Sequence, residues 1–244
     1  MDGIYSLKAE HSSLTVDVSG GRIVGLVLND MPILGTFNRI DGKTGNTHVC
    51  VPNFGDEGVK KYRLPFHGPA RTAEWKLVST TDSSLTIRYD MPKTGSYPTT
   101  VSIIQTFTLK QHSFTQEVST INTGKEAAPL NLAIHYYWCT PQGWNDLLLN
   151  GVPVSEYIKQ DTSIDAGTKS TIHIPSHSDI QLVMSGHFKK LQLWTARKEE
   201  GGNVIYDQKY ACIEPVLGTG DFFGSRESNL LPDEALSVWA RITI

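Results

Sequence analysis

The chain of 244 residues is 39% hydrophobic and 19% charged, which is enough apolar material for a sizeable core. Its formal net charge of −3 at pH 7, with no basic stripe, argues against nucleic acid or an anionic membrane surface as a partner. No apolar run approaches the length of a membrane span, and the first residues do not form a secretory signal.

Three cysteines, Cys50, Cys139 and Cys212, lie far apart in the chain and form no CxxC motif. An odd, widely spaced set is more typical of free thiols in a reducing compartment than of a disulfide framework or a zinc site. We therefore expect a cytoplasmic protein whose cysteines hold no metal.

The first segment with a clear pattern is 19–34, in which two strand-like runs flank the pair Asn29-Asp30. The turn chemistry of this pair predicts a β-hairpin. Residues 36–63 are rich in Gly, Asn, Asp and Lys and lack periodicity, so we expect a long loop that carries His48 and Asn53. Long loops in compact domains are frequently functional.

Short runs of strand character then follow one another, separated by turn signals. These runs are 71–79, 84–90, 99–110, 113–122, 170–175, 179–184, 188–196, 203–213 and 236–244. No window of eleven or more residues has a convincing helical period, and Thr, Ser, Val and Ile dominate the periodic segments. The pattern predicts an all-β fold, a large two-sheet β-sandwich in which residues 1–244 form a single domain.

Residues 64–77 combine a rigid turn with two polar side chains. His67 and Arg71 flank Gly68-Pro69, and the alternating apolar run that follows predicts a strand behind the turn. This arrangement favours a rigid site for a small polar ligand. A surface histidine at the start of a strand explains these residues equally well.

Glu214 lies in the segment Ala-Cys-Ile-Glu-Pro-Val-Leu-Gly, a carboxylate at the end of an otherwise apolar strand that we expect Pro215 to terminate. Burial there would raise its pKa and make it a plausible general base near neutral pH. The alternative is a glutamate at a strand edge with its carboxylate in water.

His135 follows an alternating run, in which Leu130, Leu132 and Ile134 face one way while Asn131 and His135 face the other. The aromatic residues that follow it suit sugar stacking and also suit a core histidine. The other histidines show no metal-ligand spacing, and the sequence contains no phosphate-binding glycine-rich loop and no GxSxG motif. We therefore assign no metal site.

Four motifs together resemble the aldose 1-epimerase (galactose mutarotase) family. They occur in the order of that family and extend over nearly the whole chain: Val51-Pro-Asn-Phe-Gly55, Pro65-Phe-His-Gly-Pro-Ala-Arg71, Leu132-Ala-Ile-His-Tyr-Tyr137 and Cys212-Ile-Glu-Pro215. The resemblance implies a twisted β-supersandwich that binds a sugar on its concave face. It also implies an isomerase that needs no cofactor.

The roles that the resemblance implies are specific. Glu214 would be the base that removes the C1 hydroxyl proton, and His135 would be the acid that protonates the ring oxygen. We expect the substrate to be held by His67, Arg71, His48 and Asn53. The expected partner is a small-molecule aldose, with or without a phosphate group, bound by a monomer or weak homodimer.

The chain departs from the family pattern at two substrate-binding positions. The loop arginine of the plain aldose branch corresponds to Phe54, and that of the hexose-6-phosphate branch to Thr44, whereas Arg71 matches the phosphate branch better. The aspartate expected between His135 and Glu214 has no clear counterpart. Two alternatives therefore stay open, a glucose-6-phosphate 1-epimerase and a carbohydrate-binding protein without turnover.

Overall fold

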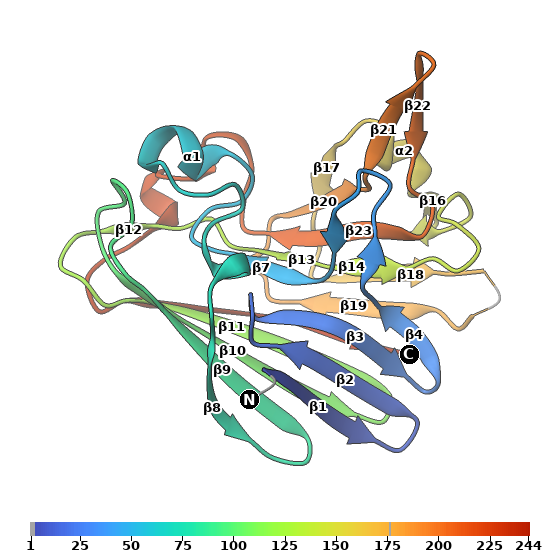
Figure 1. Ribbon diagram of the computed structural model, residues 1–244, viewed down its shortest axis with the longest axis horizontal. Helices are drawn as coiled ribbons and strands as arrows, with labels where there is room; N and C mark the ends of the chain where they lie inside the picture. The colour runs from blue at the N-terminus through green and yellow to red at the C-terminus, as the bar shows by residue number, and fades with distance from the viewer. Residues whose placement is uncertain (1–2, 176) are drawn as a thin grey trace.

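The structure, a computed structural model, describes residues 3–175 and 177–244 and consists mostly of antiparallel strands (Figure 1). The larger of its two main sheets has ten strands. In spatial order they are β1 (Ile4–Ala9), β2 (Ser12–Asp17), β3 (Arg22–Leu28), β4 (Met31–Leu34), β14 (Tyr137–Cys139), β23 (Tyr210–Val216), β13 (Ala133–His135) and β7 (His48–Cys50), with β20 (Lys190–Trp194) paired to β23 and β17 (Ser163–Asp165) paired to β20.

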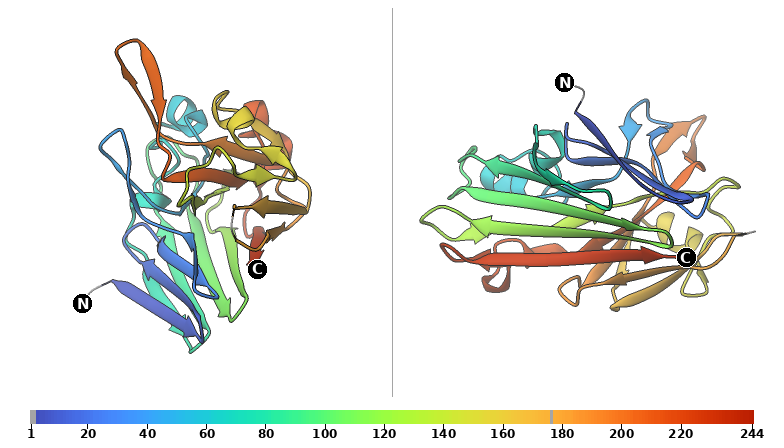
Figure 2. Two further views of the ribbon diagram at one scale, coloured as in Figure 1. Left: turned by 90° about the vertical axis from the view of Figure 1, so that its right-hand side faces the viewer. Right: turned by 90° about the horizontal axis from the view of Figure 1, so that it is seen from below.

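The second sheet has nine strands, and Figure 2 shows its longest members lying side by side. Their order is β16 (Val152–Pro153), β15 (Leu148–Leu149), β18 (Lys169–His173), β19 (Ile180–Met184), β25 (Ala235–Thr243), β11 (Ser113–Asn122), β10 (Val101–Lys110), β9 (Ser84–Met91) and β8 (Lys76–Thr80). The prediction of an all-β fold with two large sheets is confirmed.

The remaining elements are short. Three two-stranded sheets pair β5 (Phe37–Asn38) with β6 (Thr44–Gly45), β12 (Ala128–Pro129) with β24 (Asn229–Leu230), and β21 (Arg197–Glu200) with β22 (Asn203–Tyr206). The helices are α1 (Glu57–Tyr62) and α2 (Ser155–Ile158), with 3₁₀ turns at Ala70–Thr72, Gly220–Phe222 and Arg226–Ser228. None of the helices in the described residues has the length and apolar character needed to cross a membrane.

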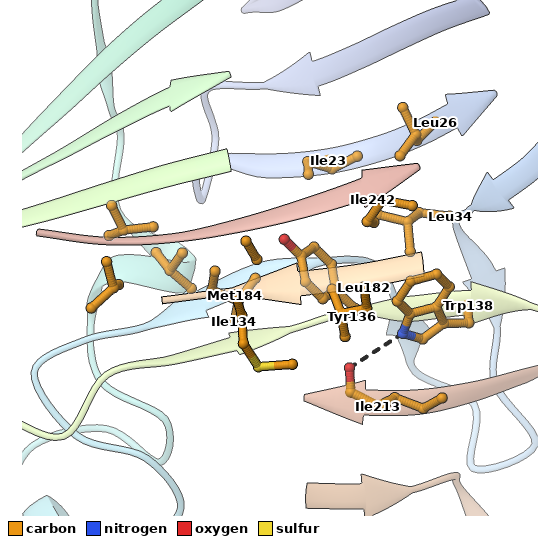
Figure 3. Packing of buried hydrophobic residues seen from close by; sticks show 14 of the residues in the cluster. Ile23, Leu26, Leu34, Ile134, Tyr136, Trp138, Leu182, Met184, Ile213 and Ile242 are labelled. Carbon is orange, nitrogen blue, oxygen red and sulfur yellow. Dashed lines mark hydrogen bonds between the residues drawn. The ribbon is translucent and has the colours of Figure 1, made fainter. Parts of the chain in front are cut away.

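The core lies between the two main sheets, and alternation along the strands decides which side chains enter it. Ile134, Tyr136 and Trp138 of the larger sheet pack there against Leu182 and Ile242 of the smaller one (Figure 3). The Trp138 indole N–H donates to the carbonyl oxygen of Ile213 at 3.2 Å (Figure 3). The alternate residues, His135 among them, therefore face away from this core, as the sequence pattern predicts.

Four local predictions were wrong. The long loop expected over residues 36–63 contains the short strands β5, β6 and β7 and the helix α1. Residues 70–72 form a 3₁₀ turn, so the strand expected from residue 71 begins only at Lys76. The run 203–213 divides between β22 and β23, because β22 pairs with β21 in a hairpin that projects from the body (Figure 1). Pro215 does not end its strand, since β20 and β13 continue to pair with β23 as far as Val216.

Candidate active site

A row of four polar side chains crosses the larger sheet. His135 pairs with His48 of β7, and the register of β13 and β14 along β23 places His135 opposite Glu214. On the other side of β23, Gln192 of β20 pairs with Glu214. Because paired residues of antiparallel strands point to the same face of a sheet, all four side chains lie on the face opposite the core.

Glu214 and His135 form the closest acid–base pair in this row. The Nε2 atom of His135 lies 3.4 Å from Oε1 of Glu214, and only 6% and 2% of the respective side chains are exposed. Burial raises the pKa of the Glu214 carboxyl, and the charge of Asp161 raises it further. Burial also lowers the pKa of His135, and nearby His48, His67 and Arg71 add to this effect. The pair therefore holds one proton at neutral pH, one group acting as donor and the other as acceptor.

His48 lies beside His135, on the neighbouring strand β7. Its ring centroid lies 4.7 Å from that of His135, and its Nδ1 lies 2.8 Å from the carbonyl oxygen of Asn46. A carbonyl oxygen only accepts hydrogen bonds, so Nδ1 of His48 carries the proton and its Nε2 does not. Burial lowers the pKa of His48 to about 3, which keeps the ring neutral.

His67 enters the site from a strained turn. Its φ of 63° lies in the left-handed region, and the next residue, Gly68, has φ 74°. A Cβ atom at Gly68 would come within 2.1 Å of the Val51 carbonyl oxygen, so only glycine fits here. The close approach of these two segments holds the His67 ring over the row of polar side chains, with its centroid 5.4 Å from that of His135.

Two hydrogen bonds join His67 to Gly55, and one of them fixes the tautomer of its ring. Its backbone N–H donates to the carbonyl oxygen of Gly55 at 2.9 Å, and the Gly55 N–H donates to Nδ1 of His67 at 3.1 Å. Since Nδ1 accepts, the neutral ring carries its proton on Nε2. Burial lowers the pKa of His67 to about 2, so the ring is a neutral hydrogen-bond donor at neutral pH.

These groups lie at a cavity of about 470 Å³, which is within the usual size range of small-molecule sites. Aromatic rings form much of its wall, and the guanidinium of Arg39 lies 4.7 Å above the ring of Trp194. The cavity is lined by Arg39, Lys43, Phe54, Gly55, Asp56, Phe66, His67, Arg71, His135, Tyr137, Asp161, Gln192, Trp194 and Glu214. Apolar rings beside polar groups suit a sugar, which has both kinds of surface.

Four of the six residues expected from the sequence line this cavity, namely Glu214, His135, His67 and Arg71. His48 is not among the lining residues and contacts the site through His135. Asn53 does not line the cavity either. Its buried side chain donates to the carbonyl oxygens of Gly55 at 3.2 Å and Pro65 at 3.4 Å, which ties together the two ends of the loop that carries His67.

Four charged residues that line the cavity, Arg39, Lys43, Asp56 and Asp161, are not among those expected from the sequence. Arg39 lies in the early loop, in which the resemblance places the substrate arginine at position 44 or 54. Asn38 and Thr44 are paired in the β5–β6 hairpin, so Arg39 lies close to position 44. Asp161 lies between His135 and Glu214 in the chain, which is the interval in which the resemblance leads us to expect an aspartate. Its φ of 51° is one that Asp tolerates.

Gln192 and Trp194 could have been found from alternation alone. In the run 188–196 they face away from Leu191 and Leu193, which enter the core. Gln192 donates to Oδ1 of Asp161 at 3.3 Å and so holds this carboxylate at the cavity wall.

Among the described residues, one group of three side chains has the donor atoms of a metal site. The ligand atoms of His135, Cys212 and Glu214 all lie within 4.8 Å of one another. Two of the three form the acid–base pair, and Cys212 is not among the residues that line the cavity. The absence of a metal stays a prediction.

A family model described as aldose 1-epimerase matches residues 26–168 of the chain, a range that includes His67 and His135. A search of curated proteins gives no match.

Solved structures share the fold. A galactose mutarotase-like protein from Lactobacillus casei superposes with a TM-score of 0.80 at 15% identity, over 99% of both chains. A galactose mutarotase related enzyme from Lactobacillus acidophilus gives 0.77 at 14% identity, over 98% of this chain and 96% of the other. A galactose mutarotase-like protein from Clostridium acetobutylicum gives 0.69 at 19% identity, over 97% and 93%. At these identities the structures show the fold alone. The family assignment rests on the family model, which matches more than half of the sequence. The chain belongs to the aldose 1-epimerase family.

Proposed function

We propose that this protein is an aldose 1-epimerase, an isomerase that interconverts the α and β anomers of an aldose by opening and closing the sugar ring. One observation carries the proposal. A buried carboxyl and a buried imidazole lie 3.4 Å apart at the wall of a cavity of suitable size, in a member of this family. Burial raises the pKa of the carboxyl and lowers that of the imidazole, so the one proton of the pair rests on Glu214 in the free protein and can pass to His135 across this contact.

The reaction needs one proton to leave the sugar and another to reach it. The proton of the pair first passes from Glu214 to His135. Glu214, now the carboxylate, takes the proton of the C1 hydroxyl while His135, as the imidazolium, gives a proton to the ring oxygen. The bond between C1 and the ring oxygen breaks, and the C1–O1 bond becomes the carbonyl of the open aldehyde. After rotation about the C1–C2 bond, the ring oxygen attacks the other face of C1, and the two residues exchange roles.

The residues around this pair are suited to hold the sugar. The N–H at Nε2 of His67 is a donor for a hydroxyl near the anomeric carbon, and the Asp161 carboxylate is an acceptor for hydroxyls farther along the ring. Trp194 offers a flat surface against which an apolar face of the sugar can pack.

The proposal is tested by two-dimensional exchange NMR between the anomeric protons of glucose, galactose and glucose 6-phosphate. We expect at least one of these sugars to exchange faster with the wild-type protein than with the Glu214→Gln variant. Equal rates for every sugar would contradict the proposal. Saturable binding without faster exchange would instead identify a carbohydrate-binding protein that has lost turnover.

Replacing Asp161 with asparagine is expected to weaken sugar binding more than it slows the reaction. Asparagine also tolerates a positive φ and can still accept from Gln192, so the variant removes the charge and keeps the shape. The side chain is 43% exposed, so we expect the low end of the range for a charge-assisted bond, with KM raised about tenfold. Saturation kinetics with Asp165→Asn as the matched control measure this, since Asp165 is outside the cavity lining; a KM unchanged by Asp161→Asn would exclude the contact.

The cations at the cavity favour a phosphorylated aldose as a second candidate substrate. Arg71 and Lys43 line the cavity, and in the described part of the chain neither the Arg71 guanidinium nor the Lys43 ammonium group makes a hydrogen bond or an ion pair. An unpaired cation beside a sugar site is suited to a phosphate group.

Arg71→Gln separates the two substrate classes. If a phosphate binds Arg71, kcat/KM for glucose 6-phosphate should fall by about 10- to 100-fold, the usual value of a charge-assisted hydrogen bond, while that for glucose changes little. Parallel kinetics on the two sugars measure the difference, with Arg88→Gln in β9 of the second sheet as a control. An equal decrease for both sugars would rule out a phosphate-specific role.

A further inference from the structure

One segment forms a whole side of the cavity. Five of the lining residues, Phe54, Gly55, Asp56, Phe66 and His67, come from residues 54–67, which we call the 54–67 wall. Helix α1 lies in the middle of this wall, and Glu57, at the start of α1, is not among the lining residues. Glu57 therefore has no direct place in the proposed chemistry.

Asn131 fastens the 54–67 wall to the strand that carries Glu214. Its buried amide exchanges hydrogen bonds with Gly218, just beyond the end of β23, at 2.9 Å to the carbonyl oxygen and 3.3 Å from the N–H. The Asn131 backbone N–H donates to the Pro52 carbonyl oxygen at 2.7 Å. The same side chain donates to Oε2 of Glu57 at 2.9 Å. One residue thus joins α1, the start of the loop and the end of β23.

Burial of the Glu57 carboxyl is what makes this junction sensitive to pH. It raises the pKa of Glu57 to about 7, although the hydrogen bond from Asn131 acts in the opposite direction, and the neighbouring Asp56 adds a smaller increase. The other charged groups at the groove of about 550 Å³ beside α1 are Lys60, Lys61 and Asp221.

None of these cations neutralises Glu57. Lys60 is paired with Asp56 at 2.6 Å, and Lys61 lies 5.4 Å from the ring centroid of Tyr62. No ion pair involves Glu57 anywhere in residues 3–175 and 177–244.

We propose that Glu57 is a positioning residue, which holds the 54–67 wall against the end of β23 through Asn131 and releases it when its carboxyl ionises. The sign follows from linkage. The pKa of the carboxyl is about 7 in the closed arrangement and returns to its ordinary value of 4.5 when the group turns to water, so between these two values the closed arrangement holds a proton that the open one has lost. The contribution of the neutral carboxyl is therefore complete below 4.5, is lost progressively as pH rises to 7, and changes no further above 7. As it is lost, the wall with Phe54 and His67 loosens. The catalytic consequence, weaker sugar binding as pH rises toward 7, rests on the proposed function.

Two measurements on the full chain test this inference, each from about two pH units below 7 to one above. For the wild type, we expect KM for anomer exchange to rise by at most about tenfold per pH unit up to 7 and to level off above it, while kcat stays nearly constant. Amide hydrogen exchange within residues 54–67, corrected for its intrinsic pH dependence, should accelerate over the same range. The Glu57→Gln variant, which keeps an acceptor for Asn131 and cannot ionise, should lose both effects.

Two further variants complete the experiment. Glu57→Asp still ionises but is one methylene shorter and cannot reach Asn131 without rearrangement, so fast exchange of the wall at every pH is expected. Glu117→Gln, on an exposed position of β11, is the matched control and should behave as the wild type.

The hydrogen-exchange result does not depend on catalysis, so failure of the proposed function would leave it intact. If wild type and Glu57→Gln show the same pH dependence of exchange in residues 54–67, the positioning role is wrong.

Discussion

Glu214→Gln is expected to reduce the rate of anomer exchange by about 10³- to 10⁴-fold, the upper part of the range for loss of a general base. Glutamine has the size and shape of glutamate, so it fills the same buried position in β23 and removes only the ability to take a proton. Exchange NMR of the best sugar at saturating concentration measures the decrease directly.

The same variant carries its own test of folding. Burial raises the pKa of Glu214, so its contribution to stability is present at low pH and is lost as pH rises through the raised value. The neutral glutamine avoids this loss, and the variant should be at least as stable as the wild type at alkaline pH by thermal unfolding. Thermal unfolding therefore distinguishes a variant that is inactive because it has lost its base from one that is inactive because it is unfolded. Full activity in a folded Glu214→Gln protein would exclude this residue as the base.

Much of the fold could be predicted because its signals are local. The alternation of residues 101–110 and 113–122 reappears as β10 and β11, paired along their whole length. The hairpin at Asn29-Asp30 forms with both residues at positive φ, as the turn chemistry requires. These features depend on neighbours in sequence, so the chain itself contains the necessary information.

The site could be predicted only where a residue lies on a strand with a clear period. His135 and Glu214 fall in alternating runs, and their faces follow from those runs. Arg39 and Asp161 lie in irregular segments, and the side chains that they contact at the cavity, Trp194 and Gln192, are distant in the chain. Asn131 could be predicted only in part. The alternation of the run 130–135 shows which face its side chain occupies, but its partners, Glu57 and Gly218, come from distant parts of the chain.

His135→Gln is expected to reduce exchange by about 10²- to 10³-fold, because glutamine can donate a hydrogen bond near the ring oxygen but cannot release a proton to it. In the wild type, the lowered pKa of His135 and the raised pKa of Glu214 keep one proton on the pair over a broad neutral range, so kcat should be nearly constant there. It should fall in acid, when the pair gains a second proton, and in alkali, when it loses the last one.

Without His135 this profile should change shape. The residual reaction then needs only the ionised Glu214, so the rate in His135→Gln should increase with pH until the raised pKa of the carboxyl is passed. Because the two groups act as a unit, the double variant with Glu214→Gln should be no slower than Glu214→Gln alone by more than a small factor. Fully additive losses in this cycle, or a flat profile in His135→Gln, would mean that the imidazole and the carboxyl do not share the proton on which the proposed reaction depends.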